Sequence, residues 1–274
     1  MGGDLGHLEA SWRVRLERQD YPQPVRDLLG QAVAAATLLS ATIKFDGFLQ
    51  LQLQGDGPVN LVLVEVTAGR TLRGLANWSG EVPDDALTQQ VGNARLAITI
   101  DPGRKGERYQ GLVCVEHDTI AAALESYFAQ SEQLATRLWL AAGPERASGM
   151  LLQQLPGPDI HDEDWNRDVL LGETITDPEL LDLSARELLH RLFHEQDLRL
   201  FEPEPVSFRC SCSRERIEAM LRGLGYDEMR DILEEQGEVS VNCEFCKQAY
   251  RFDAVDIEQL FAAADQPEVP HTRH

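Results

Sequence analysis

The sequence predicts an α+β protein with three parts: an antiparallel-sheet domain with packed helices, a helical acidic linker, and a small C-terminal domain that carries most of the cysteines. Three observations support this prediction. Strand-like runs separated by turn residues fill the first half of the chain, acidic residues gather in the segment that follows, and four of the five cysteines lie near the C-terminus. We expect the parts to span residues 1–155, 156–207 and 208–274.

The first patterned element is a helix expected over residues 23–42. This segment is rich in helix-forming residues, and Pro24 suits the first turn of a helix. The apolar stretch at 32–39 predicts that the helix is largely buried. A strand follows at 48–54, FLQLQLQ, because leucine and glutamine alternate with the two-residue period of a strand that is buried on one face.

The next strands are separated by turn signals, which predicts an antiparallel meander. Asp118 or Thr119 can cap a helix that begins after the fifth strand-like run, and two further strands close the domain. The expected elements are strands at 59–66, 71–78, 95–100, 108–116, 136–143 and 149–157, turns at 55–58, 68–70 and 101–107, and a helix at 120–133.

The linker is strongly acidic. Residues 156–205 hold fourteen acidic residues against four arginines, a net charge of −10. Ser184 and Glu187 have the spacing of a capping box and begin an amphipathic helix. Two interpretations are open. The helix can pack permanently on the first domain, or the segment can pack there only while its neighbours stay folded, as the least stable part of the structure. The apolar side of this helix carries Leu188, Leu189, Leu192 and Phe193.

The charge balance limits the classes of partner. With 46 Asp and Glu against 25 Lys and Arg, the net charge of −21 would repel a phosphate backbone, so no nucleic-acid partner is expected. No apolar stretch approaches the ~20 residues that span a bilayer, and the N-terminus lacks a signal-peptide pattern, so we expect no membrane association and a cytoplasmic location. In that reducing compartment, clustered cysteines more often bind metal or do redox chemistry than form permanent crosslinks.

Four of the cysteines form two close pairs. Cys210 and Cys212 are two positions apart, and Cys243 and Cys246 are three positions apart. Residues two apart in an extended segment face the same way, and a tight turn can bring the second pair together. Four thiolates in two pairs suit one tetrahedral zinc ion, so we predict these four side chains as its ligands. The C-terminal domain is too short to bury much core, and the ion would stabilise it.

Two interpretations of the zinc site stay open on spacing alone. The site can be a structural zinc ribbon, or it can be a redox switch. A disulfide between Cys210 and Cys212 would be strained, and strained disulfides form and break readily. Oxidation would also remove the thiolates that hold the ion, which couples oxidation to local unfolding. Cys114 lies in an apolar run and is expected to be a buried structural thiol without a functional role.

These cysteines and several other motifs resemble one protein family. The motifs are FRCSCSRER at 208–216, DYPQPV at 20–25, IKFDG at 43–47, LQLQGDGP at 51–58, GERYQG at 106–111, SEQLATRLWL at 131–140, RLFHE at 191–195 and the segment 233–257 around the second cysteine pair. The combination covers nearly the whole chain. It is similar to the bacterial redox-regulated heat-shock holdases of the HslO, or thirty-three-kilodalton chaperonin, family.

The resemblance implies an ATP-independent molecular chaperone rather than an enzyme. It implies a reduced, inactive monomer with one zinc ion in the cytoplasm. Oxidants would form two disulfides, Cys210 with Cys212 and Cys243 with Cys246, expel zinc, and unfold the C-terminal domain and the linker. The protein would then form a homodimer and hold thermally unfolding and oxidatively damaged client proteins. The opening segment is shorter than is usual in the family, which predicts a shortened first strand at one edge of the first domain.

Two other classes of function are weighed against the chaperone. A zinc-ribbon module that binds nucleic acid would use SRER at 213–216, but the overall charge opposes it. A thiol-disulfide oxidoreductase would use Cys243 and Cys246, yet such enzymes place the motif at the start of a helix, whereas the surrounding residues predict strand and turn. No other catalytic grouping stands out, so no catalytic residue is predicted.

Overall fold

The computed structural model describes residues 2–9, 12, 16, 19–103, 106–155 and 162–262. Its contacts divide the chain into two units, Met1–Arg209 and Cys210–His274. The α+β class with antiparallel sheets is confirmed. The linker helices belong to the first unit by these contacts, and the predicted three-part division stays a prediction. The middle of the predicted turn at 101–107, the start of the linker and the end of the predicted strand at 149–157 lie outside the described residues.

A six-stranded sheet forms one layer of the first unit, with the strand order β6-β5-β2-β3-β4-β9. The predicted meander is confirmed, since β2, β3 and β4 pair in sequence, while β5 returns to the other side of β2. The glutamines of β2 share one face and their amides are linked in a chain, whereas its leucines are buried. The strands are β2 (Phe48–Gln54), β3 (Val59–Thr67), β4 (Thr71–Trp78), β5 (Arg95–Asp101), β6 (Tyr109–Cys114) and β9 (Ser207–Phe208).

The two closing strands do not extend this sheet. β7 (Thr136–Ala142) and β8 (Ala147–Gln153) form a hairpin, and β1 (Gly2–Leu8) adds to it, which gives a second sheet in the order β1-β8-β7. β1 pairs with β8 along its whole length, from Gly2 opposite Gln153 to Leu8 opposite Ala147. The opening segment therefore supplies an edge strand of seven residues to this sheet.

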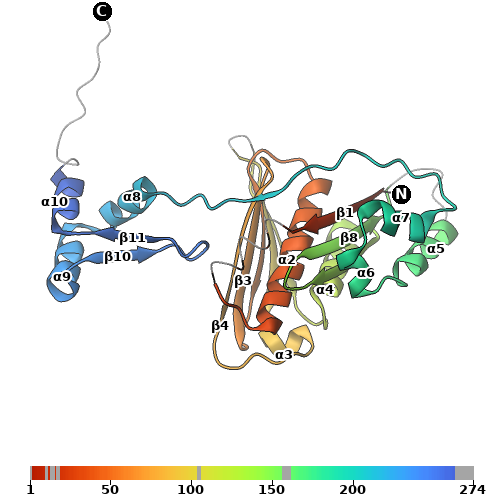
Figure 1. Cartoon of the computed structure of the whole chain (residues 1–274), viewed down its shortest axis with the longest axis horizontal. Helices are drawn as coiled ribbons and strands as arrows, with labels where there is room; N and C mark the ends of the chain where they lie inside the picture. The colour runs from red at the N-terminus through yellow and green to blue at the C-terminus, as the bar shows by residue number, and fades with distance from the viewer. Residues whose placement is uncertain are drawn as a thin grey trace, which may run out of the picture. The chain divides into compact units, whose positions relative to one another are not determined.

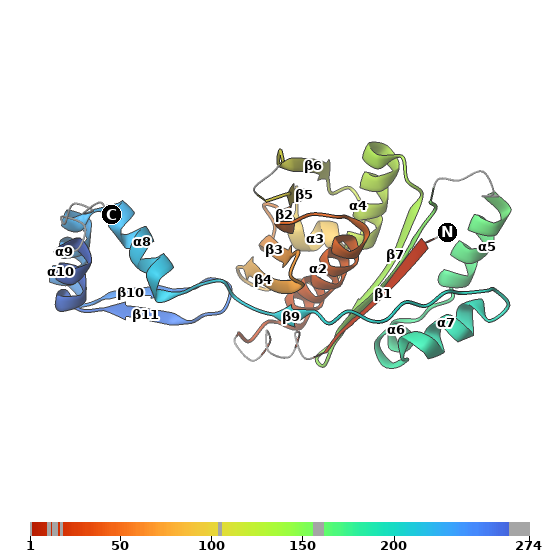
Figure 2. The same cartoon turned by 90° about the horizontal axis from the view of Figure 1, so that it is seen from above.

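Helix α2 (Gln23–Thr42) contacts both sheets and shares one hydrophobic core with them (Figures 1 and 2). Its small residues allow the close approach. A Cβ atom at Gly30 would lie only 2.5 Å from the Cβ of Ala142 on β7, so glycine is required at that contact. The predicted burial of this helix is confirmed, because both of its faces lie against a sheet.

The linker helices pack on strands of the three-stranded sheet and form a second core there. The predicted amphipathic helix is present as α7, with Ser184 and Glu187 forming the capping box. Two linker helices that precede it were not predicted, because their short apolar patterns are interrupted by acidic residues. The helices are α5 (Asp162–Gly172), α6 (Asp177–Asp182) and α7 (Ala185–Phe193). The buried residues of this second core are Ala141, Met150, Leu152, Leu180, Leu188, Leu192 and Phe193.

The remaining described elements of the first unit are short. Thr119 caps the helix predicted at 120–133, which runs as α4 (Ile120–Tyr127) and continues as a wider π-helical turn, η1 (Phe128–Glu132). Helix α3 (Leu87–Val91) was not predicted, since five residues carry no clear period. Within the described residues, no helix combines the length and the apolar composition needed to cross a bilayer.

The described part of the C-terminal unit, residues 210–262, contains three helices and one hairpin around a small core. The segments SRERIEAMLRGLG at 213–225 and YDEMRDILEEQG at 226–237 predict two short helices, which are present as α8 and α9, whereas a third helix, α10, was not predicted. The elements are α8 (Arg214–Leu224), α9 (Tyr226–Gln236), β10 (Val239–Asn242), β11 (Ala249–Phe252) and α10 (Ala254–Ala262). Six buried side chains form the core: Leu221, Met229, Val239, Phe252, Ile257 and Leu260. So small a core gives the unit little stability of its own.

Candidate metal centre

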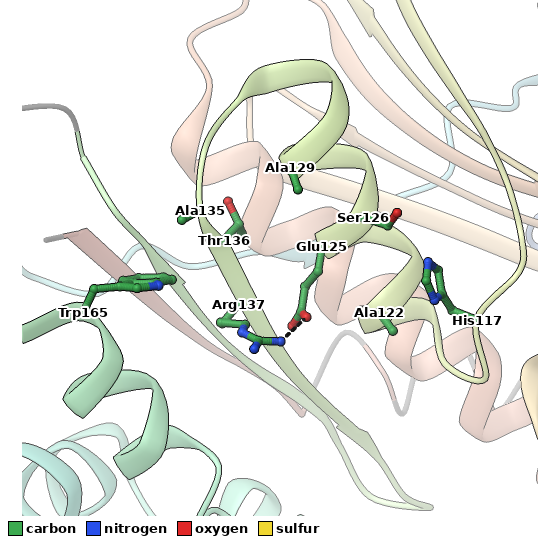
Figure 3. A pocket seen from close by; sticks show the side chains of 9 residues that line it. All are labelled: His117, Ala122, Glu125, Ser126, Ala129, Ala135, Thr136, Arg137 and Trp165. Atoms are coloured by element: carbon green, nitrogen blue, oxygen red, sulfur yellow. Dashed lines mark hydrogen bonds and ion pairs between the residues drawn. The ribbon is translucent and has the colours of Figure 1, made fainter. Parts of the chain in front are cut away.

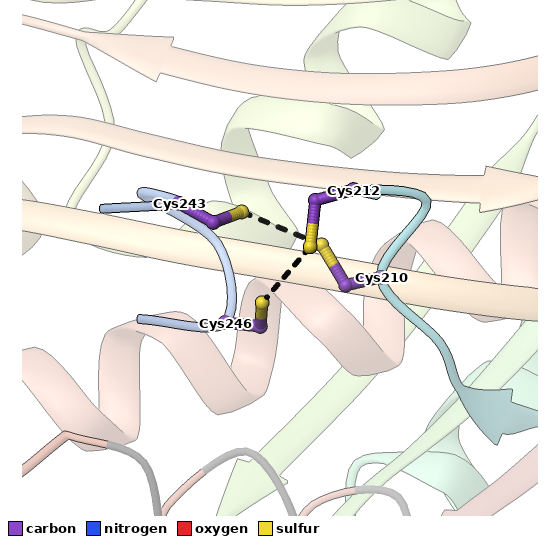
Figure 4. A group of neighbouring side chains, drawn as sticks. All are labelled: Cys210, Cys212, Cys243 and Cys246. Carbon is purple, nitrogen blue, oxygen red and sulfur yellow. Dashed lines mark hydrogen bonds between the residues drawn. The ribbon is translucent and has the colours of Figure 1, made fainter. Parts of the chain in front are cut away.

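The structure brings together the four cysteines that the sequence predicts as ligands. The sulfur atoms of Cys210, Cys212, Cys243 and Cys246 all lie within 4.8 Å of one another (Figure 4). The shortest distances join the two pairs: 3.5 Å from Cys210 to Cys243 and 3.3 Å from Cys212 to Cys246. Each sulfur of the first pair therefore faces one sulfur of the second.

The local backbone structure positions each cysteine pair. Cys210 and Cys212 lie in the extended segment just before α8, whose start is fixed by Ser213, because the Ser213 side chain accepts a hydrogen bond from the backbone N–H of Arg216. Cys243 and Cys246 lie in the turn of the β10–β11 hairpin. That turn is closed by two backbone bonds, Cys243 N to the Gln248 carbonyl at 2.9 Å and Lys247 N to the Cys243 carbonyl at 2.8 Å. Lys247 has a φ of 57°, which tightens the turn.

The hydroxyl group of Tyr250 donates a hydrogen bond to the sulfur of Cys212, at 3.2 Å. The sequence pattern did not predict a role for this residue. Tyr250 lies on β11 opposite Val241, so the hairpin register places it beside the cluster. The only signal in the sequence was an aromatic residue with a polar tip four positions after Cys246.

The electrostatics of the cluster favour a cation. Burial raises the pKa of Cys210 to about 12, and hydrogen bonds to the neighbouring thiols add to the effect. Burial also acts to raise the pKa of Cys212, but hydrogen bonds from Tyr250 and the other cysteines outweigh it and lower that pKa to about 7. The hydrogen bond to Cys212 raises the pKa of Tyr250 to about 12. The protein by itself thus stabilises one thiolate, and a divalent cation would supply the charge that holds all four ionised.

The donor set fits a tetrahedral metal. A metal–sulfur bond of ~2.3 Å places tetrahedral sulfur atoms ~3.8 Å apart, which lies between the shortest distance of 3.3 Å and the outer limit of 4.8 Å found here. These four cysteines could hold one metal ion, and their soft sulfur atoms favour zinc over hard cations.

The geometry does not support the two alternative functions. Cys243 and Cys246 lie in a hairpin turn and not at the start of a helix, so the position expected for an oxidoreductase is absent from this part of the described chain. The arginines of SRER make contacts inside the unit. Arg214 pairs with Glu218 and Asp256, and Arg216 donates to a backbone carbonyl.

A shallow pocket of about 410 Å³ lies in the first unit, against α4, β7 and α5 (Figure 3). Arg137 and Glu125 face each other in it at 2.9 Å, and the Glu125 carboxylate also accepts from the backbone N–H of Leu138. Because these charged groups are paired with each other, we assign no substrate to this pocket.

Comparison with known proteins identifies close relatives. Residues 3–253 match the family model described as "Hsp33 protein". The chain is 53% identical over 272 residues to a 33 kDa chaperonin of Nitrosococcus oceani, an alignment that covers 99% of this chain and 94% of the relative. It is 48% identical over 262 residues to a 33 kDa chaperonin of Methylobacillus flagellatus, covering 94% and 89%.

The fold also matches a solved structure. The crystal structure of a 33 kDa chaperonin (heat shock protein 33 homolog) from Thermotoga maritima aligns with a TM-score of 0.85. The alignment covers 96% of this chain and 95% of the other, at 22% sequence identity. The two chains therefore share one fold.

Proposed function

The chain belongs to the Hsp33 family, a family of chaperones, and from this premise we propose that it is a redox-regulated, ATP-independent holdase. In this proposal it protects thermally unfolding and oxidatively damaged proteins from irreversible aggregation. It acts in the cytoplasm, is inactive when reduced, and has no catalytic residues. The observation that carries the proposal is the cluster of four cysteine sulfurs within 4.8 Å, on a C-terminal unit whose described residues form a small core of six buried apolar side chains.

In the reduced state Cys210, Cys212, Cys243 and Cys246 hold one zinc ion. Bound zinc would join the segment before α8 to the β10–β11 turn and keep all four sulfur atoms as thiolates. Structural zinc in small metal-binding peptides contributes an apparent ~10–16 kcal/mol at neutral pH. That exceeds what a core of six buried side chains supplies, so the fold of the unit depends on its ligands.

Oxidation removes those ligands. Cys210 pairs with Cys212, and Cys243 with Cys246. Each pair of thiolates gives up two electrons to form one disulfide. One hydrogen peroxide accepts the two electrons, takes up two protons from the solvent and becomes two water molecules. A disulfide sulfur is no longer a thiolate, so the four side chains can no longer retain the ion. The C-terminal unit then loses its crosslink and unfolds.

Unfolding extends to the linker, whose helices cover apolar side chains of the three-stranded sheet. Their release would expose Met150, Leu152 and Ala141 on the sheet and the apolar side of α7. Exposed apolar surface of this kind binds unfolded client proteins. The net charge of −21 helps to keep a bound client in solution. The oxidised protein acts as a homodimer in this proposal.

The test is light scattering from a heat-unfolding client protein, with this protein added either reduced and zinc-loaded or oxidised by peroxide under mild heating. We expect suppression of aggregation by the oxidised form only. Equal suppression by both forms, or none by either, would show that the cysteine cluster is a passive structural site.

Tyr250 gives a further prediction. Tyr250→Phe removes the hydrogen bond to the Cys212 sulfur but keeps the aromatic ring. Loss of an outer hydrogen bond to a metal ligand weakens metal affinity by roughly 10- to 100-fold, so we expect weaker zinc binding in a competition titration with a chromogenic chelator. Tyr226→Phe is the matched control, because its hydroxyl bonds to Glu258. Equal zinc affinity of the two variants would contradict a role for the Tyr250 hydroxyl.

A further inference from the structure

Ser207 and Phe208, which form the short strand β9 near the end of the first unit, complete the six-stranded sheet. β9 pairs with the edge strand β4 in parallel, with Ser207 opposite Thr71 and Phe208 opposite Leu72. The backbone N–H of Ser207 donates to the Arg70 carbonyl at 3.0 Å, and that of Arg209 donates to the Leu72 carbonyl at 2.9 Å. Among the described strands, β9 is the only partner on this side of β4. Without it, the edge would present unpaired backbone groups.

Side chains on alternate positions of the same segment add to this contact. Val206 and Phe208 are half-buried and pack against the main core. Glu204, two positions before Val206, forms an ion pair with Arg70, the residue immediately before β4. Residues two apart in an extended chain share a face, so the edge recognises an acidic residue followed by two apolar residues at alternate positions.

The pairing of β9 with β4 is expected to be lost when the C-terminal unit unfolds. Only two residues of β9 pair with β4, and Arg209, which makes one of the two backbone bonds, directly precedes Cys210. A strand this short is held by few interactions and opens easily once the chain on either side is mobile. The trigger rests on the proposed function, whereas the edge itself is a feature of the first unit.

We propose that the β4 edge at Arg70–Leu72, once β9 has left it, binds an extended segment of an unfolded client protein by parallel strand addition. Backbone hydrogen bonds give such binding its affinity without regard to sequence, and the positions left by Val206 and Phe208 select apolar side chains at alternate residues. Unfolded proteins commonly expose such segments. β9 is the internal occupant that shows which chemistry the edge accepts.

The probe is a fluorescent peptide of residues 202–209, with binding to the full-length protein followed by fluorescence anisotropy. We expect it to bind the peroxide-oxidised protein. We also expect it to bind the reduced S207P/F208S variant, in which the proline removes the N–H that reaches Arg70 and β9 can no longer pair. Reduced wild type should bind at least ~10-fold more weakly, because its own β9 occupies the edge.

Modified peptides test the mode of binding. N-methylation of the Ser207 amide removes a donor to β4 and should weaken binding by about tenfold or more. N-methylation of Phe208 is the matched control, since successive N–H groups of a strand point in opposite directions and this one points away from β4. Equal effects of the two methylations would overturn strand addition. Undiminished binding of a peptide with serine at positions 206 and 208 would overturn the apolar selection.

Competition connects the edge to clients. The unmodified peptide should displace a heat-unfolded client from the oxidised protein and restore light scattering. Peptide binding without displacement of the client would overturn the assignment to clients.

A second copy of the chain is the other occupant to test. If its β9 occupied the edge, the peptide would bind more weakly as the protein concentration rises, and that result would assign the edge to the second copy instead. The reduced S207P/F208S arm does not depend on oxidation. If the peptide binds the reduced variant but the oxidised wild type does not suppress aggregation, the proposed function alone is refuted. If the oxidised wild type suppresses aggregation but the peptide does not bind the reduced variant, the edge site alone is refuted.

Discussion

Cys246→Ser is expected to unfold the C-terminal unit even under reducing conditions. Cys246 is only 4% exposed, and its sulfur lies 3.3 Å from that of Cys212, so its loss removes one ligand from the centre of the cluster. A serine hydroxyl is a poor substitute for a thiolate toward zinc. Because the unit has so small a core, most of the apparent ~10–16 kcal/mol that structural zinc contributes would be lost.

The measurements are zinc content per chain and limited proteolysis of the reduced protein. We expect substoichiometric zinc, and cleavage within residues 210–262 while the first unit resists the protease. Cys114→Ser is the matched control and should leave both results unchanged. The predicted burial of Cys114 is wrong, because the residue lies exposed on β6, an edge strand of the six-stranded sheet, outside the cluster. Full zinc content with a protease-resistant C-terminal unit in Cys246→Ser would show that four ligands are not required.

Leu188→Glu is expected to activate the protein without oxidation. Leu188, on α7, is fully buried in the core that the linker helices share with the three-stranded sheet. An unpaired carboxylate at that position would carry a desolvation cost of several kcal/mol, which is more than a short helix of nine residues can offset. Helix α7 would therefore detach and uncover apolar side chains such as Met150 and Leu152.

The measurement is suppression of client aggregation by the reduced, zinc-loaded variant, with protease cleavage in α7 as the direct readout of release. Leu170→Glu makes the same chemical change on α5 at a side chain that is 63% exposed, and it should leave the reduced protein inactive. A Leu188→Glu variant that is cleaved in α7 yet suppresses nothing while reduced would refute the proposed role of the covered sheet face.

The metal centre was predictable because its geometry is largely local. Residues two apart in an extended segment, and residues three apart in a hairpin turn, point the same way whatever the rest of the chain does. The spacing of Cys210 with Cys212 and of Cys243 with Cys246 therefore predicted two converging pairs. The Tyr250 contact to Cys212 joins residues 38 positions apart and depends on the hairpin register, which the sequence pattern did not specify.

The secondary structure of the first unit was equally local in origin. Alternation in FLQLQLQ and the glycine turns after it predicted β2, β3 and β4, and the Ser184–Glu187 capping box predicted the start of α7. The short elements α3, α10 and β9 were missed, because two to nine residues give too few positions for a period to stand out.

By itself, the sequence determined the segments of α2, α4 and strands β2 to β8, the amphipathic face of α7, the acidic character of the linker and the thiol cluster, all of which follow from local composition and spacing. Only the tertiary structure decided that β7 and β8 join β1 in a separate sheet, that α2 lies against both sheets, and that Ser207–Phe208 closes the β4 edge. These are pairings between segments far apart in the chain. Which segments pair depends on which apolar faces and strand edges can be buried at the same time in the whole fold. A local sequence pattern does not specify this.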